Sequence, residues 1–211
     1  MLKKTTKAQL LVVCAALSVM SIIVSNVITN KQMDFFNFAL PCGTLLVPVD
    51  YIMGDLITEV YGYRTAKNII LVAFFMNLLA VIFFMLTLAL PSFYTFTNQD
   101  AFVAVLGSTP RILAASFAAF IFGSFANAKI MAIMHVRDGE DKLAWRCIAS
   151  TIVGETLDMS VFSVFAFGGV LPWSVIFQMI WLNSLVKIAI ECILYALATR
   201  HIIKWAKGLD A

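Results

Sequence analysis

Charged side chains are scarce in this sequence. Only 13% of the 211 residues are Asp, Glu, Lys or Arg, whereas 62% are hydrophobic. A soluble domain usually carries about 25% charged residues, so this chain has too little polar surface for one or two soluble domains. The net charge of +3 is small, and no basic face interleaved with aromatic residues is seen, which argues against nucleic acid as a partner. The composition therefore predicts a lipid bilayer as the surroundings of the chain.

Residues that build covalent, metal or catalytic sites are also few. The cysteines are Cys14, Cys42, Cys147 and Cys192. They lie far apart without a CxxC spacing, so neither a disulfide framework nor a zinc site is indicated. The two histidines lie away from the apolar runs, and no HExxH, GxSxG or P-loop motif occurs. We therefore expect a protein that is not an enzyme and that has no cofactor or metal.

Long apolar runs are abundant. A helix that crosses the hydrocarbon core needs about 20 mostly apolar residues. The first run follows three lysines, as a signal peptide does, but it is long enough to span and no small-residue cleavage site ends it cleanly. The second contains Pro48, which is expected to kink or interrupt it. We predict an all-α integral membrane protein in which residues 1–211 form a single membrane domain. Its six transmembrane helices cover residues 8–28, 42–61, 67–90, 111–133, 147–168 and 172–199.

Basic residues predict the orientation of these helices. They gather at the ends of alternate spans, whereas the opposite loops contain only Lys31 and Arg111. By the positive-inside rule, both termini face the cytoplasm and the 91–109 loop faces outward. The residues that indicate the inner side are Lys3, Lys4, Lys7, Arg64, Lys67, Arg137, Lys142, Arg146, Arg200, Lys204 and Lys207.

Several charged residues nevertheless fall inside predicted spans. A charge at the centre of a membrane helix costs about 2.5–3.5 kcal/mol, so these groups must face a protein interior or a wet cavity. They could form structural ion pairs, for example between Lys187 and Glu191, which share a helix face. Acids outnumber bases among them, however, which leaves carboxylates for a polar ligand or a proton. The set comprises Asp50, Asp55, Glu59, Lys129, Glu155, Asp158, Lys187 and Glu191.

The acids recur in two similar settings. Asp55 and the fifth-span acid Glu155 each follow a glycine, and these two glycines, Gly54 and Gly154, are 100 residues apart. Spans one to three and four to six would then be repeats. Because each half has three spans, the halves would have opposite orientations. The sequence therefore predicts a 3+3 inverted repeat with a substrate site near the midplane.

The predicted substrate-binding residues are mostly carboxylates and amides. A carboxylate accepts best from a planar group with two adjacent N–H donors, such as the edge of a guanine-like base. Asn and Lys can donate to the carbonyl oxygen of such a ring. Tyr51, Phe162 and Trp181 could stack on it, although core packing or a lipid-facing position is the alternative for each. The predicted site consists of Asn26, Asp55, Glu59, Asn127, Glu155, Asp158 and Lys187.

The polar motif of the second span is long, and other motifs accompany it. It reads Pro48-x-Asp50-Tyr51-Ile52-x-Gly54-Asp55-Leu56-Ile57-Thr58-Glu59-Val60-Tyr61-Gly62 and is followed by Arg64. The others are Ser25-Asn26, Arg111-Ile-Leu-Ala-Ala-Ser116-Phe117, Ser150-Thr151-x-x-Gly154-Glu155-x-x-Asp158 and Lys187. Together they resemble the vitamin uptake transporter family, also called queuosine precursor transporters. The resemblance implies a bacterial inner membrane and import of 7-cyano-7-deazaguanine, 7-aminomethyl-7-deazaguanine or queuine for salvage into queuosine biosynthesis.

Two modes of action are left open. The chain could be a stand-alone transporter, coupled to protons through a membrane carboxylate. It could instead be the substrate-binding S component of an energy-coupling-factor complex, which would contact its partner through small residues of the first helix such as Ala15, Ala16, Ser21 and Ser25. Assembly into a homo-oligomer is left open as well.

Overall fold

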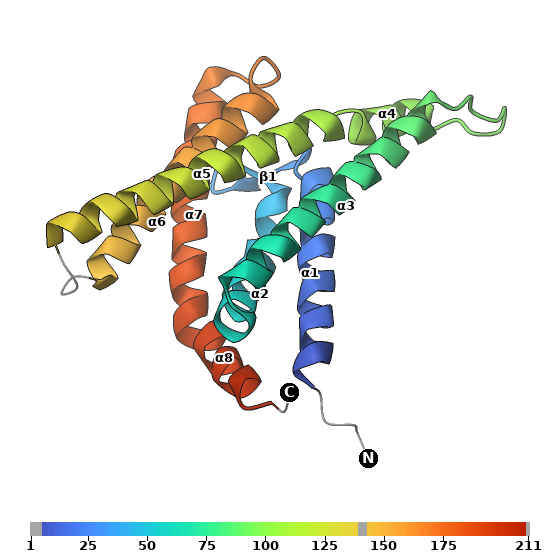
Figure 1. Ribbon diagram of the computed structural model, residues 1–211. Helices are drawn as coiled ribbons and strands as arrows, with labels where there is room; N and C mark the ends of the chain where they lie inside the picture. Colours follow the sequence, from blue (N-terminus) through green and yellow to red (C-terminus); the bar gives the residue numbers. More distant parts are fainter. Residues whose placement is uncertain (1–5, 139–142, 210–211) are drawn as a thin grey trace. The chain divides into compact units, whose positions relative to one another are not determined.

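The computed structural model describes residues 6–138 and 143–209, which are mostly helical (Figure 1). A 3-10 helix, η1 (Cys42–Leu46), precedes α2, and a π-helical turn, η2 (Tyr195–Thr199), follows α7. The α-helices are α1 (Lys7–Ile28), α2 (Val47–Tyr61), α3 (Tyr63–Ala89), α4 (Gln99–Leu106), α5 (Thr109–Asp138), α6 (Leu143–Phe167), α7 (Trp173–Leu194) and α8 (Arg200–Lys207).

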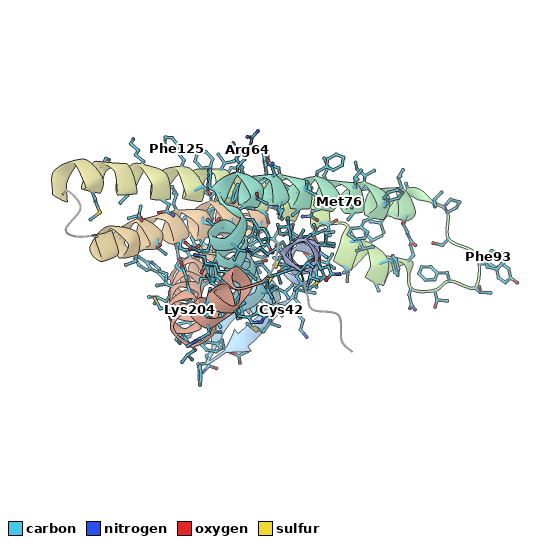
Figure 2. The ribbon with its side chains drawn as sticks, turned by 60° about the horizontal axis from the view of Figure 1, so that its bottom comes forward. Cys42, Arg64, Met76, Phe93, Phe125 and Lys204 are labelled. Carbon is cyan, nitrogen blue, oxygen red and sulfur yellow. The ribbon has the colours of Figure 1, made fainter. Side chains whose placement is uncertain are left out.

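Five helical segments within the described residues are long and apolar enough to cross a membrane. Large apolar side chains project outward from them, as expected where lipid is the solvent. In Figure 2, Met76 on α3 and Phe125 on α5 are examples, with 41% and 67% of their surfaces exposed. These findings confirm an all-α membrane protein with several spans. The segments are Lys7–Ile28, Tyr63–Ala89, Gln99–Asn127, Ala149–Phe167 and Trp173–Thr199.

The predicted second span, residues 42–61, is not among these five segments. It divides into η1 and α2, and α2 has 15 residues. At 1.5 Å per residue α2 is about 22 Å long, which is shorter than the hydrocarbon core of about 30 Å. Pro48 lies in the first turn of α2, where its missing N–H group is tolerated. The stretch is discontinuous, as expected, and the count of six spans is not confirmed.

A β-hairpin between α1 and η1 was not predicted. Its strands are β1 (Gln32–Phe35) and β2 (Phe38–Pro41), which pair in antiparallel register. Phe36 and Asn37 form the turn with φ angles of 54° and 66°, the signs found in a type I′ turn. The Oδ1 atom of Asp34 accepts a hydrogen bond from the Asn37 amide at 2.8 Å. A Phe with positive φ is uncommon, so the dipeptide gave no hairpin signal. The helix α4 was not predicted either, since it lies in the expected 91–109 loop.

The described chain forms two compact units. The first contains the residues up to Ile28, Gly43–Gly107 and those from Ile190 onward, and so includes α1, α2, α3, α4 and α8. In this unit α1, α2 and α3 pack against one another, and α8 packs against α2. The Tyr61 hydroxyl at the end of α2 donates a hydrogen bond to the Lys7 carbonyl at 2.7 Å. The core of this first unit consists of Leu10, Cys14, Leu56, Ile57, Ala66, Ile203 and Ala206.

The second unit contains the hairpin, α5, α6 and α7 as far as Ala189. The helices α5 and α6 run alongside each other over much of their length (Figure 1). At the end of α6, the Arg111 guanidinium of α5 donates hydrogen bonds to the carbonyl oxygens of Phe165, at 2.7 Å, and Gly168. These carbonyls lack helical partners. The core of this unit consists of Ala115, Ala166, Phe167, Ile176, Met179 and Ile180.

Three expectations about the architecture remain predictions. They are the orientation in the membrane, the inverted repeat and the single membrane domain over residues 1–211. Among the basic residues that predict the orientation, Lys3, Lys4 and Lys142 lie outside the described residues. The side chains of His135, Arg137, Arg146, Cys147 and Arg200 lie outside the described part of the structure as well.

Candidate functional site

A charged cluster lies inside the second unit. The Lys187 Nζ atom on α7 is 3.2 Å from Glu155 Oε2 and 3.0 Å from Asp158 Oδ2, both on α6. The three side chains are 18%, 20% and 24% exposed, so they are largely removed from the surroundings. The structure therefore brings three of the predicted site residues together.

The helices α6 and α7, with the turn that joins them, position the three charged residues. Glu155 and Asp158 are three residues apart and therefore share one face of α6. A tight turn reverses the chain after α6, and Gly169 has a φ angle of +76° there, which a residue with a side chain rarely adopts. Next to this turn, Ala166 and Phe167 on α6 belong to one apolar cluster with Ile176 and Met179 on α7. Lys187 lies further along α7, where its Nζ atom contacts both acids.

The charges within this cluster do not balance. One ammonium group faces two carboxylates, so the three groups carry a formal charge of −1 when all are ionised. Each carboxylate has about four acceptor positions, and the Nζ atom has three protons to donate. The cluster therefore retains acceptor capacity for a donor-rich ligand or for a proton.

The same face of α6 approaches α5 very closely. A Cβ atom added to Gly154 would lie 2.9 Å from the Cβ atom of Asn127 and 3.2 Å from the Gly123 carbonyl oxygen. A Cβ atom added to Gly123 would lie 2.9 Å from the Cβ atom of Asp158. The two glycines thus allow the backbones of α5 and α6 to touch, as small residues do in membrane helix pairs. Asn127, a further predicted site residue, lies at this contact, and its side chain is largely exposed.

The other predicted site residues belong to the first unit. Asn26 near the end of α1 is buried, and Asp55 on α2 is partly buried. Glu59, one turn after Asp55, accepts a hydrogen bond from Lys207 Nζ of α8 at 2.8 Å. These last two side chains are about half exposed, at 55% for Glu59 and 50% for Lys207. Glu59 therefore takes part in an exposed ion pair that links α2 to α8.

The three aromatic candidates have different surroundings. The ring of Phe162 packs edge-to-face against Phe167 at 6.0 Å in the core of the second unit. Trp181 is 66% exposed, as expected for a side chain that faces lipid. Tyr51 is partly buried. For Phe162 and Trp181 the structure thus favours the alternatives of core packing and a lipid-facing position.

Sequence reasoning missed two buried asparagines. Asn77 in α3 is 1% exposed, and its amide nitrogen has no hydrogen-bond partner among the described residues. Asn183 in α7 is 3% exposed, and its amide nitrogen lies 3.5 Å from the Met159 sulfur atom. A single amide in an otherwise apolar span is a detectable signal, because a buried amide needs a hydrogen-bond partner. These neutral groups lack the charge that distinguishes the buried acids in the sequence.

A metal site is a separate question. Among the described residues, no group of three or more His, Cys, Asp or Glu side chains is placed to hold a metal ion. Lys187 already provides the positive charge beside Glu155 and Asp158. Within the described residues, the positive charge beside these two acids therefore comes from a side chain.

Comparisons with known proteins found a matching family and a named relative. Residues 41–200 match the sequence profile of a family described as "putative vitamin uptake transporter". The chain is also 26% identical over 183 residues to a Bacillus subtilis protein named "probable queuosine precursor transporter", a match that covers 85% of this chain and 80% of the relative. No solved structure matches. Because the family and this relative are transporters, the expectation that the chain is not an enzyme is confirmed. The chain is a multi-pass membrane transporter that belongs to the vitamin uptake transporter family.

Proposed function

We propose that this transporter imports 7-deazaguanine precursors of queuosine across a bacterial cell membrane. The observation that carries the proposal is the cluster of Lys187, Glu155 and Asp158, in which two carboxylates share one cation inside a membrane protein. The name of the Bacillus subtilis relative supports the substrate class. The candidate substrates are 7-cyano-7-deazaguanine, 7-aminomethyl-7-deazaguanine and queuine.

The chemistry of the ring fits the cluster. A deazaguanine presents its N1–H group and its exocyclic amine on one edge, so that two N–H donors lie side by side. A carboxylate accepts such a pair in a bidentate manner. Glu155 or Asp158 is expected to bind this edge, and Lys187 holds the two acids in place before the substrate arrives. Asn127 lies beside α6 at the glycine contact and is the next candidate for contact with the ring.

Asp55 has a separate proposed role. It is a partly buried carboxylate on α2, and a membrane carboxylate can exchange a proton during transport. We assign proton coupling to Asp55 and expect Asp55→Asn to reduce uptake while the protein still inserts. An uncoupler should then reduce uptake by the wild-type protein. Uptake that is insensitive to the uncoupler would contradict the assignment.

We also propose that η1 and α2 together form a sixth crossing, so that both termini face the cytoplasm. Residues 42–61 are long enough for this if the 3-10 helix contributes to the span. The first unit holds α1, α2 and α3, and the second holds α5, α6 and most of α7, a grouping in line with a 3+3 repeat. Single cysteines placed at residues 31 and 64 should be labelled from opposite sides of the membrane by an impermeant reagent.

The alternative role as an S component depends on an available surface of α1. Ser21 is fully buried within the first unit, and the Ser25 hydroxyl donates to the Gly43 carbonyl at 3.3 Å. The two serines thus contact their own unit, which argues against a docking face that includes them, whereas Ala16 on the same helix is exposed.

Uptake in cells tests the proposed function most directly. A bacterial strain that lacks its own queuosine precursor transporter, and has no energy-coupling-factor ATPase, is given this chain alone and labelled 7-cyano-7-deazaguanine. We expect accumulation of the label and queuosine in tRNA. A matched strain that expresses Lys187→Met is the control and should accumulate little label. Equal accumulation in cells with and without the chain would overturn the proposal.

A further inference from the structure

The helix α8 has two different faces. Ile203 and Ala206 are three residues apart and therefore share one face. Both are buried, and they belong to the core of the first unit. Lys204, Trp205 and Lys207 are exposed on the remaining surface of the helix. The helix α8 thus presents a basic surface that contains one large aromatic ring.

Packing places α8 at the end of the first unit where two spanning helices begin. Lys7 and Tyr63 are the first residues of α1 and α3, and both helices are long and apolar enough to cross a membrane. The hydrogen bond from the Tyr61 hydroxyl to the Lys7 carbonyl joins the end of α2 to the start of α1. Two residues earlier on α2, the ion pair of Glu59 and Lys207 joins α2 to α8. Because a spanning helix begins near the boundary of the hydrocarbon core, α8 lies at the level of the lipid headgroups.

The charge at this end of the first unit is mostly of one sign. Residues 63–67 and 200–207, the start of α3 and the whole of α8, contain no acid. Arg64 on α3 and Lys204 on α8 are exposed, and Figure 2 shows them on different sides of this end. Glu59, near the end of α2, is already paired with a lysine of α8. An excess of exposed positive charge therefore surrounds this end and complements an anionic surface.

The depth of α8 and its aromatic ring favour a lipid as the source of that anionic surface. Trp and Tyr are enriched where a membrane meets water, because their rings lie at the level of the headgroups. Trp205 on α8 is 52% exposed, and Tyr63 at the start of α3 is 74% exposed. Basic residues that served only to orient the chain would not need to pack against the unit. The contact of α8 with α2 instead fixes them at headgroup depth.

We propose that the exposed surface of α8, formed by Lys204, Trp205 and Lys207, binds the headgroups of anionic phospholipids such as phosphatidylglycerol. The lysine ammonium groups donate to the phosphate oxygens. An ammonium group has three protons, so Lys207 can keep its contact with Glu59 and still donate to a lipid. The indole ring of Trp205 lies among the headgroups beside the two lysines. The proposal concerns the lipid and not the transported substrate, so it does not depend on the proposed function.

Quenching of Trp205 fluorescence by brominated lipids tests this proposal. The chain has four tryptophans, and the other three are replaced by phenylalanine in the full-length protein. This protein is reconstituted with brominated phosphatidylglycerol or with brominated phosphatidylcholine at equal mole fraction. We expect phosphatidylglycerol to bind at least about fivefold more strongly at low salt, the preference that one basic residue confers. At about 1 M salt, where charges are screened beyond about 3 Å, most of the preference should disappear. Lys204→Gln should lower the preference about fivefold.

Lys31→Gln is the matched control, because it removes an exposed lysine from the second unit. It should leave the preference of the α8 surface for phosphatidylglycerol unchanged. If Lys31→Gln and Lys204→Gln lowered the preference equally, the net charge of the protein would attract the lipid, and the proposal would be wrong. Equal quenching by the two lipids before any lysine is changed would overturn it as well. If neither lipid quenched Trp205, the surface of α8 would face a soluble partner instead, which also contradicts the proposal.

A second measurement covers the case in which the protein with a single tryptophan fails to insert. Native mass spectrometry then counts the phospholipids that remain bound to the chain with all its tryptophans. Lys204→Gln should retain fewer phosphatidylglycerol molecules than Lys31→Gln does, and both should retain similar numbers of phosphatidylcholine molecules. Equal retention of phosphatidylglycerol by the two variants would overturn the proposal.

Discussion

Lys187 Nζ on α7 lies 3.0 Å from Asp158 Oδ2 on α6, although 29 positions separate the two residues in the chain. The same Nζ atom also contacts Glu155, one turn earlier on α6. A single lysine thus holds two acids that would otherwise repel each other, and it does so inside a unit whose core is apolar.

Replacing Lys187 should affect binding more than folding. Lys187→Met removes the cation that orders both carboxylates, and hydrogen bonds to charged groups contribute about 1.5–3 kcal/mol. We expect affinity for 7-cyano-7-deazaguanine to fall at least tenfold, measured by calorimetry on purified protein. Lys187→Arg should retain part of the affinity because it keeps the charge. If Lys187→Met bound 7-cyano-7-deazaguanine with an unchanged Kd, Lys187 would have only a structural role.

The two glycines that the sequence places 100 residues apart should respond differently to alanine. In Gly154→Ala the new Cβ atom would lie 2.9 Å from the Asn127 Cβ atom, so α5 and α6 must separate, at a cost of about 1–3 kcal/mol. Gly54→Ala is the matched control because, among the described residues, no group outside its own helical turn lies within 4 Å of its new Cβ atom. It should be neutral or stabilising, since alanine favours helix. Thermal unfolding in detergent measures both variants, and equal losses would contradict the close contact at Gly154.

Arg111 should stabilise the end of α6. Arg111→Ala deletes the hydrogen bonds to the Phe165 and Gly168 carbonyls. Because the guanidinium group is exposed, we expect a loss of only about 1 kcal/mol in unfolding free energy. Hydrogen exchange should become faster at residues 165–171 and remain unchanged in α3. If hydrogen exchange became equally faster in α6 and in α3, the substitution would destabilise the whole protein and not only the end of α6.

The ion pair of Glu59 and Lys207 should contribute little stability. Both side chains are about half exposed, and such pairs contribute about 0–1 kcal/mol. Glu59→Gln and Lys207→Ala should therefore each lower the unfolding free energy by less than about 1 kcal/mol, with similar effects on uptake. A severe loss of uptake in Glu59→Gln alone would support the sequence-based prediction that Glu59 binds substrate.

Much of the membrane architecture could be predicted from the sequence, because length and apolar content suffice to recognise a spanning helix. The exceptions are informative. The stretch 42–61 contains Pro48 and three acids, and the structure divides it into η1 and the 15-residue helix α2. The hairpin turn at Phe36-Asn37 lacks the glycine that usually marks such turns. In both cases the local backbone differs from the structure that composition and turn residues predict.

The candidate site was predictable in part. The spacing of Glu155 and Asp158 by itself places both acids on one face of a helix, and their burial follows from their position in an apolar run. Only the tertiary structure decided which cation they share, because that depends on the register between α6 and α7. The same register places Asn183 beside Met159, which no periodicity in the sequence reveals.

The sequence alone determined that this chain is a membrane protein and that its buried acids require partners, since both conclusions depend on composition and on spacing within single helices. The tertiary structure decided the partners themselves. Lys187 reaches Glu155 and Asp158 on α6, a contact that the spacing of residues along α7 does not reveal. Gly54 and Gly154 occupy similar motifs, yet of these two only Gly154 lies against a neighbouring helix. Contacts between helices depend on which faces pack together, and packing is a property of the whole fold.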